Sequence, residues 1–202
     1  MRLIGDRIEA GTYLLAAAAS AGSVTAQGID PLFFGKFLDL LYDLGLDVET
    51  SSDSVRVSRR GDLKAVNLAT NPFPEIATDL QAPLMAALSL ACGESRIEEN
   101  VFEGRFGHAS ELCRMGAQIE ISERAAIIRG VDKLSAAEVE GGDIRAAACL
   151  VIAGLAADGV TRIYEPSHIR RGYDSLEDKL RGLGATVAFR SSDIEDYSFA
   201  GC

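Results

Sequence analysis

The chain has 202 residues, of which 48% are hydrophobic and 25% are charged, a composition typical of a globular protein. Its 30 acidic residues outnumber its 20 basic residues and give a formal net charge of -10. This balance argues against nucleic acid as a partner, because a protein that follows a phosphate backbone needs a basic stripe. A small anionic ligand is not excluded, because it needs only a local cluster of arginines.

The cysteines and the apolar segments argue against two further classes. The four cysteines show no short paired spacing and only two histidines are present, so we expect no metal site, which would need clustered thiolates or imidazoles. The apolar run Tyr13–Ala21 follows Asp6 and Glu9, and carboxylates do not belong in the basic start of a signal peptide. The apolar run Ala146–Ala157 is too short to cross a bilayer. We therefore expect a cytoplasmic protein with no membrane partner.

The chain contains one pattern three times. Each copy begins with an Asp, runs into an alanine-rich helix, meets a Gly, and continues through a strand and a second helix to a Leu-Gly or Met-Gly pair. The copies begin at Asp6, Asp79 and Asp143, and the two glycines within a copy are 23, 23 and 25 residues apart. Agreement this close predicts three copies of one structural unit.

The first two copies have clear element boundaries. An Asp before an apolar run is a helix N-cap, and a Gly after the run is a C-cap. In the first copy, Ser54–Ser58 alternates polar and apolar residues, and Gln118–Ile121 does the same in the second. Such alternation predicts strands.

The third copy shows where its helices lie. Ala146–Ala157 has no polar face, so protein must enclose this helix. Tyr173–Leu183 instead combines charged residues with Leu176, Leu180 and Leu183, which predicts a helix with one exposed face.

One enclosed helix and one amphipathic helix in each copy, with strands between, predict an α/β fold with the helices wrapped by sheets. We expect a single domain over residues 1–190, built from βαβαββ-type units at about 1–58, 59–130 and 131–190. The units would surround a pseudo-threefold axis as an inside-out α/β barrel, helices inside and sheets outside. Residues 191–202 are polar and acidic without periodicity, and we interpret them as a tail.

Several short segments between residue 6 and about residue 190 resemble the enolpyruvyl transferase family, and they occur in the same order as in the family. They resemble the members that act on UDP-N-acetylglucosamine more than EPSP synthase. The segments are Asp6-Arg-Ile-Glu-Ala-Gly-Thr-Tyr13, Thr78-Asp-Leu-Gln-Ala82, Glu99-Asn-Val-Phe-Glu-Gly-Arg-Phe106, Glu111–Gly116, Val131–Ser135, Asp143-Ile-Arg-Ala146, Arg171-Gly-Tyr173 and Lys179–Ala185.

This resemblance implies one half of an enzyme in which two such domains face each other across the active site. The reaction would move the enolpyruvyl group of phosphoenolpyruvate to the 3-hydroxyl of UDP-N-acetylglucosamine, with loss of phosphate. This is the first committed step of peptidoglycan synthesis, so a role in cell wall biogenesis, cell shape and cell division follows. No metal or organic cofactor is implied.

By resemblance, Asp79 is the carboxylate that hydrogen-bonds the sugar 3-hydroxyl and takes its proton. An alcohol is far less acidic than a carboxylic acid, so the proton can leave only in concert with C–O bond formation. The alternative is helix capping, because all three copies place an Asp at this position. The two roles can coexist.

The resemblance assigns two further substrate contacts. Val101 matches a position that contacts the nucleotide sugar through its backbone, although a valine in a strand can simply be a core residue. Arg171 matches an arginine that binds phosphoenolpyruvate, whose carboxylate and phosphate need bidentate guanidinium donors.

Three residues have accessory assignments by the same resemblance. Arg105 and Arg145 line the cleft, where they contact ligand or hold Asp79 and Asp143 in place. Asp143 handles protons or only caps its helix. We interpret both histidines as packing or capping residues.

The chain also departs from the family pattern. The family's other half supplies a Lys-Asn pair and a loop whose Cys acts as an acid on the methylene of phosphoenolpyruvate, and this sequence shows neither. We therefore expect no turnover by this chain alone, a partner half in cis or in trans, and self-association through the exposed cleft face. The alternative is a non-catalytic module that binds a nucleotide sugar or a partner protein.

Single positions depart from the family pattern as well. The positions that differ from the usual family residue are Gly104, Gly107, Gly142, Ala147 and Arg170.

Overall fold

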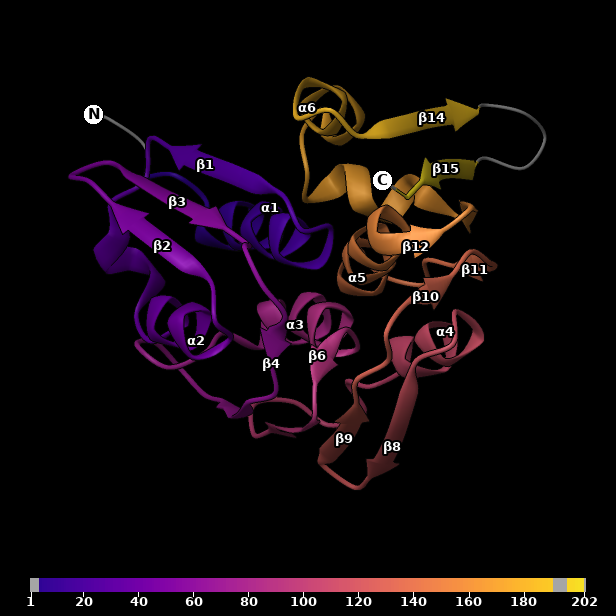
Figure 1. The fold of residues 1–202 in the computed structure, drawn as a ribbon, viewed down its shortest axis with the longest axis horizontal. Coiled ribbons are helices and arrows are strands. Elements are labelled where there is room, and N and C mark those ends of the chain that lie inside the picture. The colour runs from indigo at the N-terminus through magenta and orange to yellow at the C-terminus, as the bar shows by residue number, and fades with distance from the viewer. Residues whose placement is uncertain (1–3, 191–195, 202) are drawn as a thin grey trace.

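The computed structural model describes residues 4–190 and 196–201, and its strands and helices form an α/β fold. They fall into three groups along the chain, coloured from indigo to yellow in Figure 1. No helix in this described part is both long and apolar enough to cross a bilayer.

The first group ends in a three-stranded antiparallel sheet of order β1-β3-β2. The Asp6 carboxylate caps its first helix, because it accepts hydrogen bonds from the amides of Ile8 at 2.7 Å and Glu9 at 3.3 Å. The strand predicted at Ser54–Ser58 is confirmed as β3. The elements are α1 (Arg7–Ala19), β1 (Ser23–Gln27), η1 (Pro31–Phe34), α2 (Phe37–Asp43), β2 (Asp47–Thr50) and β3 (Ser54–Ser58).

The second group adds a leading strand, so its sheet has the order β5-β7-β9-β8. Strand β5 lies parallel to β7, and the other pairs are antiparallel. A short parallel pair, β4 with β6, precedes this sheet. The elements are β4 (Leu63–Lys64), β5 (Asn67–Thr70), η2 (Thr78–Leu80), α3 (Gln81–Leu88), β6 (Ala91–Cys92), β7 (Glu94–Glu99), α4 (His108–Arg114), β8 (Gln118–Ser122) and β9 (Ala125–Arg129).

The third group repeats this plan, with sheet order β11-β13-β15-β14 and a short parallel pair, β10 with β12. Strand β11 is again parallel to β13. The elements are β10 (Leu134–Ser135), β11 (Glu138–Glu140), α5 (Ile144–Ala156), β12 (Ala157–Asp158), β13 (Val160–Tyr164), η3 (Pro166–Arg171), α6 (Leu176–Gly182), β14 (Thr186–Arg190) and β15 (Asp196–Ala200).

Strand β15 corrects the predicted tail. Asp196–Ala200 lies between β13 and β14 in the sheet, and Tyr197 and Phe199 are buried. The interpretation of residues 191–202 as a tail is therefore wrong for this segment, and the third unit extends to Ala200 instead of ending at residue 190. The rest of the predicted tail, residues 191–195 and 202, lies outside the described residues.

The core forms where the first helices of the three groups meet. Helices α1, α3 and α5 contact one another in the middle of the molecule (Figure 1). Helix α5 is buried from Ala146 to Leu155, as its lack of a polar face predicts. The sheets lie around these helices but remain separate from one another, so the described residues form no closed barrel of the predicted kind.

Candidate active site

One pocket lies where the starts of three helices converge. It encloses about 200 Å³. Its walls come from the starts of α1 and α5, from η2, and from the segment between η3 and α6. The residues that line it are Asp6, Ile8, Glu9, Asp79, Ile144, Arg145, Gly172 and Tyr173.

Asp79 lies in this pocket between two arginines. Its Oδ1 accepts a hydrogen bond from Nε of Arg145 and a longer one, 3.5 Å, from Nη1 of Arg105. The Asp79 side chain is 36% exposed, so a ligand can reach it. Among the described residues no hydrogen-bond donor is found for its second oxygen, Oδ2.

Asp79 differs from its equivalents Asp6 and Asp143. Both of those carboxylates cap the helix that follows them. Asp79 instead lies inside the 3-10 turn η2, and α3 begins after it without a side-chain cap within the described residues. The turn directs the carboxylate toward the arginines, so the capping interpretation does not explain this residue.

The start of α5 positions Arg145. The Asp143 carboxylate accepts hydrogen bonds from the amides of Arg145 at 2.7 Å and Ala146 at 2.9 Å. This cap fixes the first turn of α5, from which the Arg145 guanidinium reaches Asp79. Asp143 therefore acts on Asp79 through the backbone of α5, and it makes no ion pair with Arg105 or Arg145 in the described structure.

Arg105 comes from the loop before α4. Its guanidinium carbon lies 4.2 Å from the centre of the Phe102 ring, a cation–π contact that orients the side chain. The Arg105 side chain is only 19% exposed. Arg105 is thus held between Phe102 on one side and Asp79 on the other.

The last two predicted site residues are less closely tied to Asp79. Val101 is half-buried, and its amide donates a hydrogen bond to Glu99. Arg171 ends η3, is exposed, and directly precedes Gly172, which lines the same pocket as Asp79. No hydrogen bond or ion pair to the Arg171 guanidinium is found in the described part of the chain.

Sequence reasoning missed Tyr173, a buried pocket residue. Its hydroxyl lies 2.9 Å from Oγ1 of Thr12. Burial raises the pKa of Tyr173 to about 12, and the negative charges of Asp6, Glu9 and Asp79 add to this rise against the opposing bond to Thr12. Tyr173 therefore stays protonated at neutral pH and can act only as a neutral hydrogen-bonding group.

Sequence reasoning also missed Glu99, which connects the two segments that carry the site. Its buried carboxylate accepts hydrogen bonds from the Val101 amide at 2.9 Å, the Phe102 amide at 3.1 Å and the Thr78 hydroxyl at 2.9 Å. Thr78 directly precedes Asp79, and Phe102 supports Arg105. Glu99 thereby fixes the Asp79 turn against the Arg105 loop.

Replacing Glu99 by Gln should destabilise the fold and loosen this loop. The amide is uncharged and has one acceptor oxygen where the carboxylate has two, so the three part-buried hydrogen bonds cannot all persist as bonds to a charged acceptor, and we expect a loss of about 1–3 kcal/mol. Urea unfolding measures this loss, and hydrogen exchange at Val101 and Phe102 should become faster. The matched control is Glu98→Gln on the exposed face of the same strand, which should change neither. Equal effects of both variants would contradict this role.

His108 begins α4 and packs in the interior, as the packing interpretation expects. It is 5% exposed, and its Nε2 has no hydrogen-bond partner among the described residues. Burial lowers the pKa of His108 to about 4, against a smaller opposing effect of Asp143. The imidazole is therefore neutral at neutral pH.

His108 should make the fold acid-sensitive between pH 6.5 and 4. The unfolded chain binds a proton on this histidine near pH 6.5, whereas the folded chain binds it only near pH 4. Stability present above pH 6.5 is therefore lost as the pH falls through this window, by up to about 3 kcal/mol. His108→Phe should flatten this part of the curve in urea unfolding between pH 8 and 4. If the free energy of unfolding fell by the same amount between pH 7 and pH 4.5 in His108→Phe and in the wild type, this role of His108 would be contradicted.

Two departures from the family pattern have a local explanation. Arg170 is held by Tyr197 and Glu177, at 3.0 Å each, and its guanidinium lies 4.0 Å from the centre of the Phe189 ring. Its charge is thus engaged with α6 and the third sheet. Gly104 has φ of 66°, a left-handed conformation that glycine adopts without strain.

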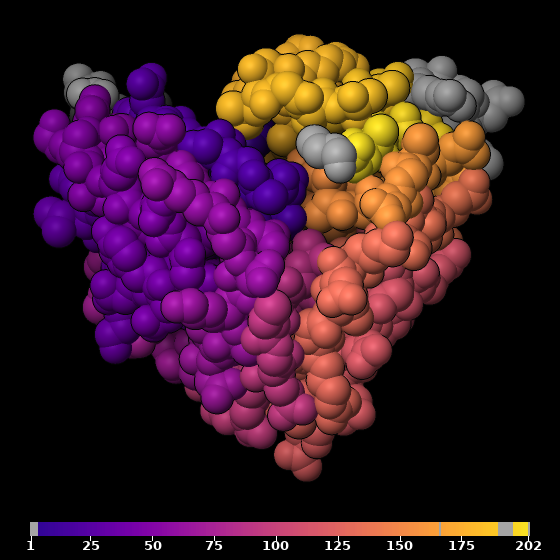
Figure 2. All heavy atoms as spheres, in the orientation of Figure 1, coloured from indigo at the N-terminus to yellow at the C-terminus, as the bar shows by residue number. Residues whose placement is uncertain are grey.

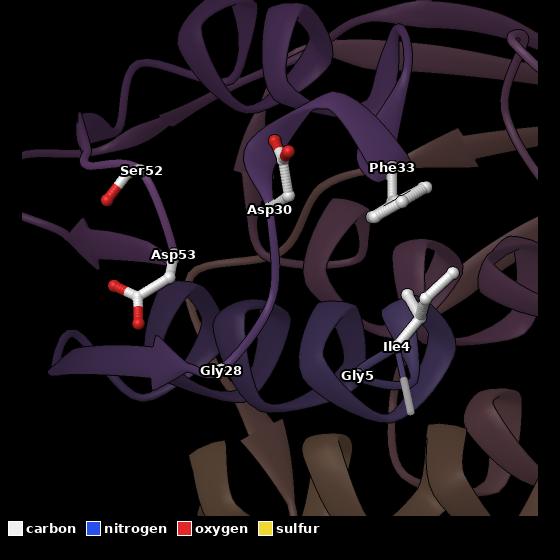
Figure 3. A pocket seen from close by; sticks show the side chains of 7 residues that line it. All are labelled: Ile4, Gly5, Gly28, Asp30, Phe33, Ser52 and Asp53. Atoms are coloured by element: carbon white, nitrogen blue, oxygen red, sulfur yellow. The ribbon is translucent and has the colours of Figure 1, made fainter. Parts of the chain in front are cut away.

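A second pocket fits an anionic ligand poorly. Figure 3 shows its lining, which comes from the segment before α1, from the loop after β1 together with η1, and from the loop after β2. It has two carboxylates and no basic side chain, whereas the pocket around Asp79 includes Arg145. The residues that line this second pocket are Ile4, Gly5, Gly28, Asp30, Phe33, Ser52 and Asp53.

In the described part of the chain no group of His, Cys, Asp and Glu suits a metal ion.

The family follows from comparison with known proteins. The sequence profile of EPSP synthase (3-phosphoshikimate 1-carboxyvinyltransferase) matches residues 1–180. The chain therefore belongs to the EPSP synthase family of enolpyruvyl transferases.

Among curated relatives, the chain is similar to enzymes named UDP-N-acetylglucosamine 1-carboxyvinyltransferase. The Thermotoga petrophila protein is 48% identical over 93% of this chain and 44% of its own length. The protein numbered 3 from Symbiobacterium thermophilum is 49% identical over 92% of this chain and 44% of its own length. The chain thus spans less than half the length of the relatives it matches.

Solved structures agree on the fold. The enolpyruvyl transferase NikO from Streptomyces tendae has a TM-score of 0.82 at 27% identity, covering 98% of this chain and 45% of that one. EPSP synthase from Acinetobacter baumannii has a TM-score of 0.76 at 20% identity, covering 100% of this chain and 47% of that one. At 20% identity, the similarity to EPSP synthase from Acinetobacter baumannii concerns the fold alone.

Proposed function

We propose that this chain is the part of a two-part enolpyruvyl transferase that holds Asp79 against the acceptor sugar. The acceptor is UDP-N-acetylglucosamine and the donor is phosphoenolpyruvate. The sugar 3-oxygen forms a bond to C2 of phosphoenolpyruvate, and the bond from C2 to the phosphate oxygen breaks to release phosphate. The names of the relatives support this choice of acceptor.

The observation that carries the proposal is the geometry of the Asp79 carboxylate. Both arginines bind Oδ1, which leaves Oδ2 available to accept a hydrogen bond from the 3-hydroxyl. As the C–O bond forms, the hydroxyl proton passes to the carboxylate. Arg105 and Arg145 keep the carboxylate in one orientation, which reduces the entropy lost in reaching the transition state.

The remaining site residues complete this proposal. Arg171 is exposed beside the pocket and binds the carboxylate or phosphate of phosphoenolpyruvate through its guanidinium. Val101 contacts the nucleotide sugar through its backbone. The complementary part supplies the acid that protonates the methylene carbon as the C–O bond forms. The resulting methyl group then loses one proton to a base as phosphate leaves, which restores the C=CH2 double bond of the product. This sequence of steps uses neither a metal nor an organic cofactor.

The same proposal includes the expected pathway, the cellular location, the symmetry of the three units and the self-association of the chain. The reaction places the chain in peptidoglycan synthesis in the cytoplasm, and through it in cell shape and cell division. The repeated sheet order of the second and third groups supports three units related by a pseudo-threefold axis. Without its complement, the chain presents the pocket face to solvent and self-associates there, which light scattering over a concentration series would detect.

Product analysis tests the choice of substrates. The chain is combined with the complementary part of a relative, phosphoenolpyruvate and one acceptor at a time. Mass spectrometry should detect the enolpyruvyl ether of UDP-N-acetylglucosamine and no product from shikimate 3-phosphate. Product from shikimate 3-phosphate alone would refute the proposed acceptor. Binding of the nucleotide sugar without product would favour the non-catalytic module.

A further inference from the structure

The segment that carries Arg171 is held on both sides. Arg171 ends η3 and is exposed. The two residues after it, Gly172 and Tyr173, line the pocket around Asp79. The residue before it, Arg170, contacts α6 and the third sheet instead. The place of Arg171 beside the pocket therefore depends on the contacts of its neighbours.

On the pocket side, the backbone packs against the starts of two helices. A Cβ atom on Gly172 would lie 3.1 Å from Cγ2 of Ile144, so the Gly172 backbone lies directly on the first turn of α5. The Tyr173 hydroxyl lies 2.9 Å from Oγ1 of Thr12 in α1. The amides of Gly172 and Tyr173 both donate to the Ile169 carbonyl, at 3.1 and 2.9 Å. These contacts fix the chain just after η3.

On the other side, three groups hold the guanidinium of Arg170. Its Nε donates to the Tyr197 hydroxyl and its Nη2 donates to Glu177, each at 3.0 Å. Its carbon lies 4.0 Å from the centre of the Phe189 ring, a cation–π contact. The Tyr197 hydroxyl in turn donates to the second oxygen of Glu177 at 3.0 Å. Arg170, Tyr197 and Glu177 thus form a closed set of three charge-assisted hydrogen bonds.

The Tyr197 hydroxyl comes from a buried part of the third sheet. Tyr197 is 1% exposed, and its strand β15 lies between β13 and β14. The centre of its ring lies 5.0 Å from that of Phe189 and 6.0 Å from that of Phe199, distances typical of packed aromatic pairs. Figure 2 shows the yellow atoms near the end of the described chain lying against the orange atoms of the third group. The hydroxyl therefore has a fixed place, and so has the arginine that bonds to it.

These contacts hold Arg170 more firmly than an ordinary surface ion pair would. An isolated exposed pair contributes little, but the Glu177 side chain is only 18% exposed and Tyr197 is buried. A planar guanidinium can bond two partners and stack on a ring at the same time. The set of contacts therefore fixes Arg170 in one orientation, and with it the last turn of η3.

We propose that Arg170 is a positioning residue, which sets the direction of the Arg171 guanidinium at the pocket around Asp79. Successive side chains of a 3-10 turn point about 120° apart, so a bound Arg170 fixes the direction in which Arg171 leaves the turn. The inference rests on the proposed function, in which Arg171 binds phosphoenolpyruvate. A preset arginine has less side-chain freedom to lose on binding, so the affinity for phosphoenolpyruvate should depend on Arg170.

Hydrogen exchange of the chain without its complement tests the contact independently of the reaction. Tyr197→Phe keeps the ring in β15 and the charge of Arg170, but it removes the hydroxyl to which Arg170 donates. The amides of Gly172 and Tyr173 should then exchange roughly tenfold faster, because the last turn of η3 opens more often. Unchanged rates at both amides would overturn the proposal.

The matched control for this exchange experiment is Tyr42→Phe. It removes a hydroxyl that donates to the Val48 carbonyl at 2.9 Å in the first group. This variant should leave exchange at Gly172 and Tyr173 unchanged. Equal acceleration by Tyr42→Phe and Tyr197→Phe would overturn the proposal, because the effect would then be a general loss of stability.

Kinetics of the chain combined with its complement test what the contact does. Tyr197→Phe should raise KM for phosphoenolpyruvate about tenfold, the effect of losing about one charge-assisted contact. It should change kcat and KM for UDP-N-acetylglucosamine by less than about twofold. Arg170→Met should act in the same direction, and the double variant should be no worse than Arg170→Met alone, because both changes act through one contact.

The outcomes separate positioning from the other roles that Arg170 can have. If Arg170→Met raised KM for phosphoenolpyruvate but Tyr197→Phe did not, Arg170 would act by its charge alone, and the proposal would be overturned. Similar changes in kcat and in both KM values would also overturn it, because they indicate a general defect. Absence of product from the wild-type mixture would refute the proposed function instead, and the exchange experiment would still decide whether Arg170 fixes η3.

Discussion

Replacing Asp79 by Asn should lower kcat of the reconstituted transferase by about 100- to 10,000-fold, the usual contribution of a positioned general base. The amide has nearly the same shape but cannot take the proton of the sugar 3-hydroxyl. It also removes the charge that Arg105 and Arg145 bind. Phosphate release at saturating phosphoenolpyruvate and UDP-N-acetylglucosamine measures kcat.

A matched control separates catalysis from general loss of charge. Asp62→Asn removes a carboxylate from an exposed turn and should leave kcat and KM unchanged. Circular dichroism melting of both variants checks that the fold persists. If Asp79→Asn retained more than about a tenth of the wild-type kcat, Asp79 would not be the base.

Turnover should depend completely on the complementary part. The isolated chain should release no phosphate above background, because in the proposed reaction the complementary part supplies the acid that protonates phosphoenolpyruvate. Adding the separately produced complementary part of a relative, such as the Thermotoga maritima enzyme, should restore release in proportion to the complex formed. This relative is 49% identical over 93% of the chain, so its interface should be compatible.

The control for this experiment is the same complement with the Asp79→Asn chain, which should bind but not restore turnover. Sedimentation of the mixture shows whether the complex forms. Ordinary turnover by the isolated chain would show that the active site is complete without the complement. A complex that forms without any turnover would instead favour the non-catalytic module.

The repeated plan could be predicted because its signals are local. Gly45, Gly116 and Gly184 follow the ends of α2, α4 and α6 in a left-handed conformation, and alternation marks strands such as β3. The prediction of a Gly C-cap after each alanine-rich run is wrong, because α1, α3 and α5 have their C-caps at Ser20, Ser89 and Ala157, and the glycines instead directly precede β1, β7 and β13. Strand β15 could not be predicted in this way. Asp196–Ala200 becomes a strand because it pairs with both β13 and β14, and such pairing depends on tertiary context more than on intrinsic propensity.

The candidate site, like the fold, could be predicted from the sequence only in part. The motifs placed Asp79, Arg105 and Arg145 on the list of candidates, but three copies of an N-terminal Asp could not show which of them does not cap a helix. Only the 3-10 turn at Asp79 separates it from its equivalents. Glu99 and Tyr173 were missed because their roles come from buried contacts with residues distant in sequence, such as Thr12.

The proposed function requires that the nucleotide sugar binds in the pocket around Asp79. Its most direct test is titration of the isotopically labelled chain, combined with its complement, with UDP-N-acetylglucosamine while amide resonances are recorded. The largest shifts should lie at Asp79, Val101 and Arg145, and Asp79→Asn should reduce them. Shifts confined to the pocket of Asp30 and Asp53, with none at Asp79, would contradict the account.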